Sequence, residues 1–86
     1  MSAETTGGRL WALVQEHRDA QPYPPSDRAI AARLGISPTA LANWRGPSRL
    51  PERRNLEALA RLVGVPYRKV LSAALVDAGY IDPEEV

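Results

Sequence analysis

The sequence predicts an all-α domain of five helices, with two short helices and a tight turn at its centre. No segment alternates apolar and polar residues as a half-buried strand does. Apolar residues instead recur at helical spacing, as in Leu56, Leu59, Ala60 and Val63. Between such stripes stand the residues that typically stop and start helices, chiefly glycine, proline and serine. These patterns together favour an all-α fold.

Size and composition indicate one small domain and exclude several functions. The chain has 86 residues, of which 44% are hydrophobic, and it has no cysteine, so disulfides and thiolate metal sites are excluded. With one histidine and no phosphate-cradling glycine loop, an enzyme is poorly supported. We expect no metal, cofactor or small-molecule ligand. Neither a membrane-spanning run nor a secretory signal is visible, so we expect a cytoplasmic protein without membrane contact.

Charge is unevenly distributed although the net charge is only +1. Residues 1–44 balance four arginines against four acids, whereas residues 45–69 hold seven bases and two acids. Residues 70–86 hold four acids and no base. A basic middle and an acidic end are typical of a protein with one phosphate-facing surface. Arginine-rich composition from a GC-rich genome is an alternative explanation.

The N-terminal third predicts an arm, a helix and a stiff connection. Residues 1–8 are polar and aperiodic, which favours a flexible arm. A helix is expected over residues 9–20, where an apolar stripe is widened by Trp11. Three prolines within residues 21–25 end this helix and force an extended connection. Tyr23, within that connection, is expected to pack against the domain.

Local signals then place two short helices in succession. Ser26 can cap the first, and Gly35 supplies the left-handed residue that ends it. Ser37 can cap the second, with Pro38 at the first helical position, where a missing N–H costs nothing. The second helix ends before Gly46.

The C-terminal half predicts two longer helices. The first is expected from about Pro51 to Val63, where Gly64 ends it. The second opens at Pro66 and ends at Gly79. The expected organisation is therefore an arm over 1–8, a helix-turn-helix domain over 9–81 and an acidic tail over 82–86.

The stretch from Asp27 to Gly46 matches a helix-turn-helix at every position that sets its shape. The fourth, eighth, tenth, fifteenth and eighteenth residues are apolar, the fifth is alanine and the ninth is glycine. The apolar residues fix both helices to the rest of the domain, so that the second helix projects with a set orientation. These seven residues are Ile30, Ala31, Leu34, Gly35, Ile36, Leu41 and Trp44.

With this motif the chain resembles the Cro and phage-repressor (XRE-type, lambda-repressor-like) family of DNA-binding proteins. The resemblance covers about residues 9–79 and includes L-E-A-L-A-R-L-V-G-V over 56–65. It implies a transcriptional regulator of the repressor type, phage or prokaryotic. In such proteins the second of the two short helices, which is the third helix of the domain, enters the major groove of double-stranded DNA. Two departures from the family are the longer proline-rich connection and Asp27, where a backbone-touching amide is common.

The resemblance implies base contacts from the exposed face of the third helix. Asn43 can donate to and accept from adenine, and Thr39 can hydrogen-bond a base or contact a thymine methyl. The expected base-contacting residues are Ser37, Pro38, Thr39, Ala42 and Asn43. Because Asp27 would repel phosphate, Ser26 or Arg28 is expected to take its place. The expected phosphate-contacting residues are Ser26, Arg28, Arg45, Arg49, Arg53 and Arg54.

Two expectations concern protein partners. One short reading helix covers few bases, which favours a homodimer through the last helix and Tyr80-Ile81. The alternative function is a protein-interaction module on the same fold, as an antitoxin or anti-repressor partner.

Overall fold

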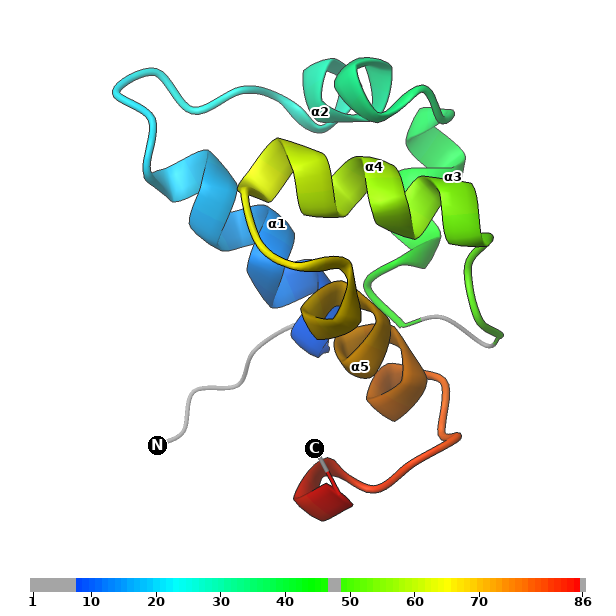
Figure 1. The fold of residues 1–86 in the computed structure, drawn as a ribbon. Coiled ribbons are helices and arrows are strands. Elements are labelled where there is room, and N and C mark those ends of the chain that lie inside the picture. The colour runs from blue at the N-terminus through cyan, green and yellow to red at the C-terminus, as the bar shows by residue number, and fades with distance from the viewer. Residues whose placement is uncertain (1–7, 47–48, 86) are drawn as a thin grey trace.

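Five α-helices pack around one apolar core in the computed structural model, which describes residues 8–46 and 49–85 (Figure 1). No strand occurs in these two ranges, and the predicted all-α, five-helix fold is confirmed. A 3-10 turn, η1, follows the last helix. The elements in chain order are α1 (Arg9–Asp19), α2 (Asp27–Leu34), α3 (Pro38–Asn43), α4 (Arg53–Val63), α5 (Tyr67–Asp77) and η1 (Pro83–Glu85).

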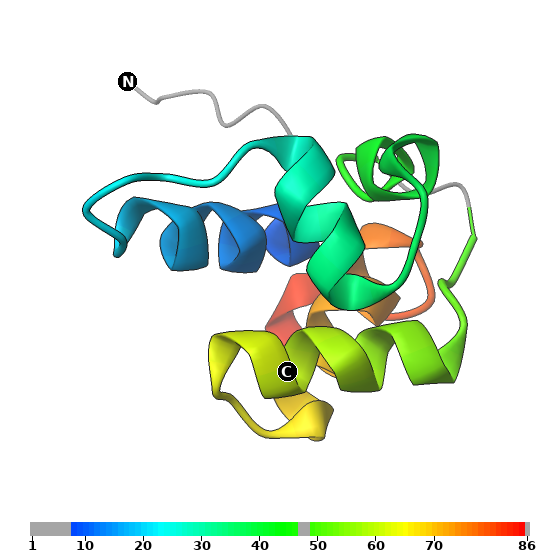
Figure 2. The ribbon, with the colours of Figure 1, turned by 90° about the horizontal axis from the view of Figure 1, so that it is seen from above.

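The core joins all five helices. α1, α4 and α5 pack on one another, while α2 packs on α4 and carries α3 (Figures 1 and 2). Each helix contributes at least one fully buried aliphatic side chain, and burying one such side chain stabilises a fold by about 1.5–3 kcal/mol. These side chains belong to Leu10, Val14, Ile30, Leu41, Leu56, Leu59 and Val70.

The turn between α2 and α3 has the predicted local geometry. The Ser26 hydroxyl oxygen accepts the Ala29 N–H at 3.1 Å, and the Ser37 hydroxyl oxygen accepts the Ala40 N–H at 3.0 Å. Gly35 ends α2 with φ of 77°, a left-handed conformation that glycine adopts without steric cost. The starts of α2 and α3 and the end of α2 are therefore determined by Ser26, Ser37 and Gly35, as expected.

Both longer helices begin slightly later than expected. α4 begins at Arg53, because Glu52 is still extended with ψ of 147° and Pro51 lies outside the helix. Pro66 is likewise extended, with ψ of 146°, so it precedes α5 instead of opening it. A proline fixes its own φ but leaves ψ free, and both starts are set by the extended ψ of the residue before the helix.

The expectation that Tyr23 packs against the domain is wrong. Its side chain is 89% exposed. Tyr23 stands between two prolines in a connection that swings away from the helices before returning to α2 (Figure 1). The backbone bends at residues 21–23, and this bend carries the ring outward.

The start of α1 is held by a residue far away in the sequence. Gly8 occupies the N-cap position and has no side chain to cap the helix. The Asp77 carboxylate does so instead, since Oδ1 accepts the Arg9 N–H at 2.9 Å and Oδ2 accepts the Leu10 N–H at 2.8 Å. A β-carbon at Gly8 would lie 2.4 Å from Asp77 Oδ1, so only glycine allows this approach. The positive end of the α1 dipole also favours the carboxylate.

Gly8 is also tied to the end of α3, because its N–H donates to the Arg45 carbonyl oxygen at 3.1 Å. The last residue of the predicted arm is thus part of the packed domain, and residues 1–7 lie outside the described ranges. Within those ranges, no helix has the length and apolar character needed to cross a membrane.

Candidate nucleic-acid interface

α3 separates its residues into an inner and an outer set. Leu41 is fully buried and Trp44, just past the helix end, is 4% exposed, so both fix α3 to the domain. α3 packs mainly against α2, which leaves its opposite side open. All five residues predicted to contact bases are exposed: Ser37, Pro38, Thr39, Ala42 and Asn43.

The polar groups on this outer face differ in how much they are already engaged. The Ser37 hydroxyl oxygen caps α3 with one of its two lone pairs, so the hydroxyl hydrogen and one lone pair are left for other partners. The Asn43 amide takes part in no hydrogen bond among the described residues, so it retains both donor and acceptor capacity. Asn43 is thus the residue on α3 best able to make a bidentate contact.

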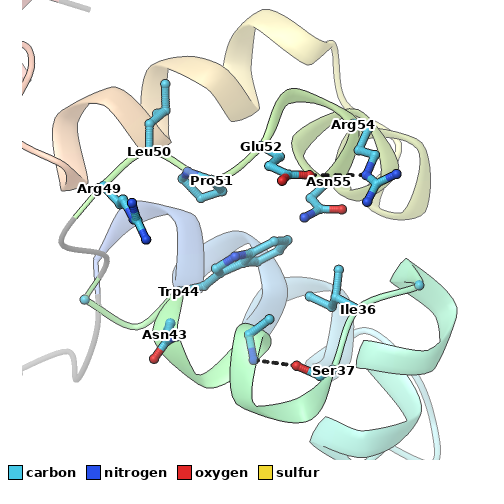
Figure 3. Close-up of a pocket in the computed structure, with 13 residues that line it drawn as sticks. Ile36, Ser37, Asn43, Trp44, Arg49, Leu50, Pro51, Glu52, Arg54 and Asn55 are labelled. Carbon is cyan, nitrogen blue, oxygen red and sulfur yellow. Dashed lines mark hydrogen bonds and ion pairs between the residues drawn. The ribbon is translucent and has the colours of Figure 1, made fainter.

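A hollow of about 800 Å³ lies between α3 and the start of α4 (Figure 3). Asn43 and Trp44 line it from the α3 side, and Arg49, Arg54 and Asn55 line it from the other. The Trp44 ring lies in the middle of the view, between Asn43 and Asn55. Sequence reasoning did not select Asn55. The available signal was its position in the first turn of α4, directly after two arginines.

Three of the predicted phosphate-contacting arginines have carboxylate partners. Arg45 pairs with Asp27 at 3.4 Å, and Arg53 pairs with Glu57 at 3.0 Å. Arg54 pairs with Glu52 at 3.3 Å. Exposed pairs of this kind contribute about 0–1 kcal/mol, so each can exchange its carboxylate for a phosphate at low cost. The net positive charge beside α3 is therefore lower than a count of arginines suggests.

The remaining phosphate candidates are exposed. Arg28 and Arg49 form no ion pair with another described residue, and Ser26 is engaged in capping α2. In Figure 2, the start of α2 lies on one side of α3 and the segment leading into α4 lies on the other. The candidates thus form two groups that flank the outer face of α3.

Asp27 links α2 to α1 and to the turn after α3 at one edge of this surface. Its carboxylate pairs with Arg18 of α1 and with Arg45, which lies two residues past the end of α3. The Arg45 guanidinium stacks 4.6 Å from the centre of the Trp11 ring, and that of Arg18 lies 5.9 Å from it. A guanidinium over an indole contributes about 0.5–2 kcal/mol. Arg45 is therefore anchored to α1, although it is 51% exposed.

Comparisons with protein-family models, curated proteins and solved structures find no significant match to this chain. No group of three or more potential metal-ligating side chains lies together in the described ranges.

Proposed function

We propose that this protein is a sequence-specific regulator of transcription, of the repressor type, that binds double-stranded DNA through α3. The proposal extends the resemblance to the Cro and phage-repressor family. One observation carries it: α3 buries the residues that fix its position and exposes a face of short polar and small side chains. Arginines from two directions flank that face.

The size of α3 suits the major groove. Six helical residues extend about 9 Å, and the groove is about 12 Å wide, so the whole outer face can approach the base edges. The exposed side chains are short, which requires this close approach. Asn43 supplies the bidentate contact, while Thr39 and Ala42 supply methyl groups for thymine.

The flanking groups supply affinity that does not depend on sequence. Arg49 and Arg54 line the hollow beside α3, and the free N–H groups at the start of α4 add partial positive charge there. Ser26 and Arg28 offer a second set of contacts at the start of α2. Arg54 leaves Glu52 when it binds phosphate, since the exposed pair is weak.

Binding is measured by fluorescence anisotropy on DNA selected from a random pool and on scrambled DNA. Asn43→Ala is expected to weaken binding to the selected site by ~1–3 kcal/mol and to leave scrambled DNA almost unaffected. Equal losses on both DNAs would show that Asn43 does not read sequence.

Arg54→Ala and Arg61→Ala form a matched pair, because both remove an exposed arginine from α4. Arg54→Ala is expected to reduce the slope of log K against log salt by ~0.9, and Arg61→Ala to leave it unchanged. If the protein binds neither selected nor scrambled DNA at low salt, the proposal is rejected and the protein-interaction module is favoured.

A further inference from the structure

Three cations lie on a side of α1 and α5 that no residue of α2 or α3 lines. They belong to the exposed side chains of Arg9, Arg68 and Lys69. Among the described residues, none of the three takes part in an ion pair, whereas three arginines near α3 each have a carboxylate partner. Arg68 and Lys69 also stand in the first turn of α5, where the helix dipole disfavours cations. This side of the domain is therefore positively charged, and a bound anion would relieve the repulsion.

These cations border a groove between α1 and α5, two helices that pack against each other. Its volume is about 380 Å³. Leu13 and Ala73 provide the apolar part of its lining, and Ser72 provides a hydroxyl group. Ser72 stands four residues after Arg68, and therefore on the same side of α5. Ala73 stands in the same relation to Lys69. The groove thus offers cations, a hydroxyl group and apolar surface within a small space.

The lining of this groove matches one class of ligand better than others. An inorganic anion would contact the cations but leave the apolar surface of Leu13 uncovered, and a neutral apolar molecule would make no use of the charges. Small-molecule sites have volumes of about 300–1,000 Å³, so this groove suits a small ligand. A carboxylate accepts hydrogen bonds from guanidinium, ammonium and hydroxyl groups, which are the polar groups present. The lining therefore favours a small molecule with one carboxylate and an apolar body.

We propose that this groove binds a small amphipathic carboxylate, such as a medium-chain fatty acid in its ionised form. The carboxylate accepts hydrogen bonds from Arg68, Lys69 and the Ser72 hydroxyl. The apolar body lies along Leu13 and Ala73 and removes their exposed surface from water.

The surroundings of the groove are compatible with this ligand. Asp77 stands one turn after Ala73, but its carboxylate already accepts the Arg9 and Leu10 N–H groups at 2.9 and 2.8 Å, so it does not occupy the cations. Because no residue of α2 or α3 lines the groove, the ligand and DNA can be bound together. The proposal replaces the expectation of no small-molecule ligand. Sequence spacing could not reveal this site, since its two sides come from helices at opposite ends of the domain.

Sodium octanoate is the probe, and its binding to the full chain is followed by NMR titration of the backbone amide signals. No DNA is present, so the result does not depend on the proposed function. The signals of Leu13, Ser72 and Ala73 are expected to shift more than those of α2 and α3. Octylammonium and octanol have the same apolar body without the negative charge, and are expected to bind at least about fivefold more weakly. From butyrate to hexanoate to octanoate, affinity is expected to rise about two- to fourfold for each added methylene.

Two double variants test the role of the cations. Arg68→Gln/Lys69→Gln is expected to weaken octanoate binding about five- to twentyfold, because the carboxylate loses two charged partners. Arg33→Gln/Arg61→Gln is the matched control, since it removes two exposed arginines outside the groove and is expected to leave octanoate affinity unchanged. Circular dichroism confirms that both are folded. If the first is not, Arg9→Gln takes its place, with an expected weakening of about two- to fivefold.

Several results would overturn the proposal. Equal affinities for octanoate and octylammonium would show that the cations do not select the ligand, and equal losses in the two double variants would show that the effect is not confined to the groove. Amide shifts that avoid α1 and α5 would place the ligand elsewhere. Phosphatidylglycerol vesicles test an anionic bilayer as the source of the same chemistry, and they are expected not to retain the protein. Retention on vesicles without binding of octanoate would reject a free carboxylate as the ligand.

Discussion

The clasp between Asp77 and the start of α1 predicts a specific non-additive effect on stability. Asp77→Ala removes two hydrogen bonds of 2.9 and 2.8 Å from a charged acceptor. Hydrogen bonds to charged groups contribute about 1.5–3 kcal/mol each when buried, and this site is partly exposed, so we expect a total loss of about 2–3 kcal/mol. For a domain of this size, that corresponds to a fall in Tm of about 10–20 °C.

Gly8→Ala is expected to act through the same clasp. The new β-carbon would lie 2.4 Å from Oδ1, so the carboxylate must move and weaken at least one hydrogen bond. We expect a cost of about 1–2 kcal/mol in the wild type. In the Asp77→Ala background the obstruction is gone, and the substitution should stabilise slightly, by about 0.4–1 kcal/mol, because alanine restricts the unfolded chain.

Urea unfolding followed by circular dichroism measures all four proteins of this double-mutant cycle. Asp19→Ala, which removes an exposed carboxylate at the other end of α1, is the control and should change stability little. If the costs of Gly8→Ala and Asp77→Ala simply add, the two residues are not coupled and the clasp does not hold α1 as argued.

Two further predictions concern the edge of the interface and the turn before α3. Asp27→Asn should lower stability by about 0.5–1.5 kcal/mol, because Arg18 and Arg45 lose their charged partner. It should also raise DNA affinity, because Arg45 no longer has to leave a carboxylate to reach phosphate; an unchanged affinity in anisotropy titrations would show that Asp27 does not compete with phosphate for Arg45. Gly35→Ala should cost about 1–2 kcal/mol in urea unfolding through its left-handed backbone alone, since nothing lies within 4 Å of the added carbon. Gly46→Ala, equally uncrowded but without positive φ, should be close to neutral, and equal costs at both sites would refute the backbone explanation.

Features encoded by neighbouring residues could be predicted from the sequence. Ser26, Gly35 and Ser37 act within three or four residues of their positions, and the structure places each in the expected role. The buried positions of α3 also followed from spacing, because helical periodicity alone separates Leu41 and Trp44 from the exposed residues between them.

Contacts between distant segments could not be predicted in this way. Asp27 was interpreted from the sequence as a residue of the first helical turn and as a departure that would repel phosphate. Its carboxylate in fact links α2 to α1 and to the turn after α3, through Arg18 and Arg45. Asp77 gave no signal at all, since its two partners stand 68 and 67 residues earlier. No spacing rule relates such residues, and only packing of the whole domain brings them together.

The clasp also has a consequence for the order of events during synthesis. A ribosome releases Gly8 early and Asp77 only near the end of the described chain. Until then the first turn of α1 has no cap. Gly8, whose N–H donates to the Arg45 carbonyl oxygen, is then not held in place by α1. Nascent chains that end before residue 77 should therefore hold α1 only loosely. The end of α5 thus completes the first turn of α1, which makes folding of the domain cooperative across the described residues.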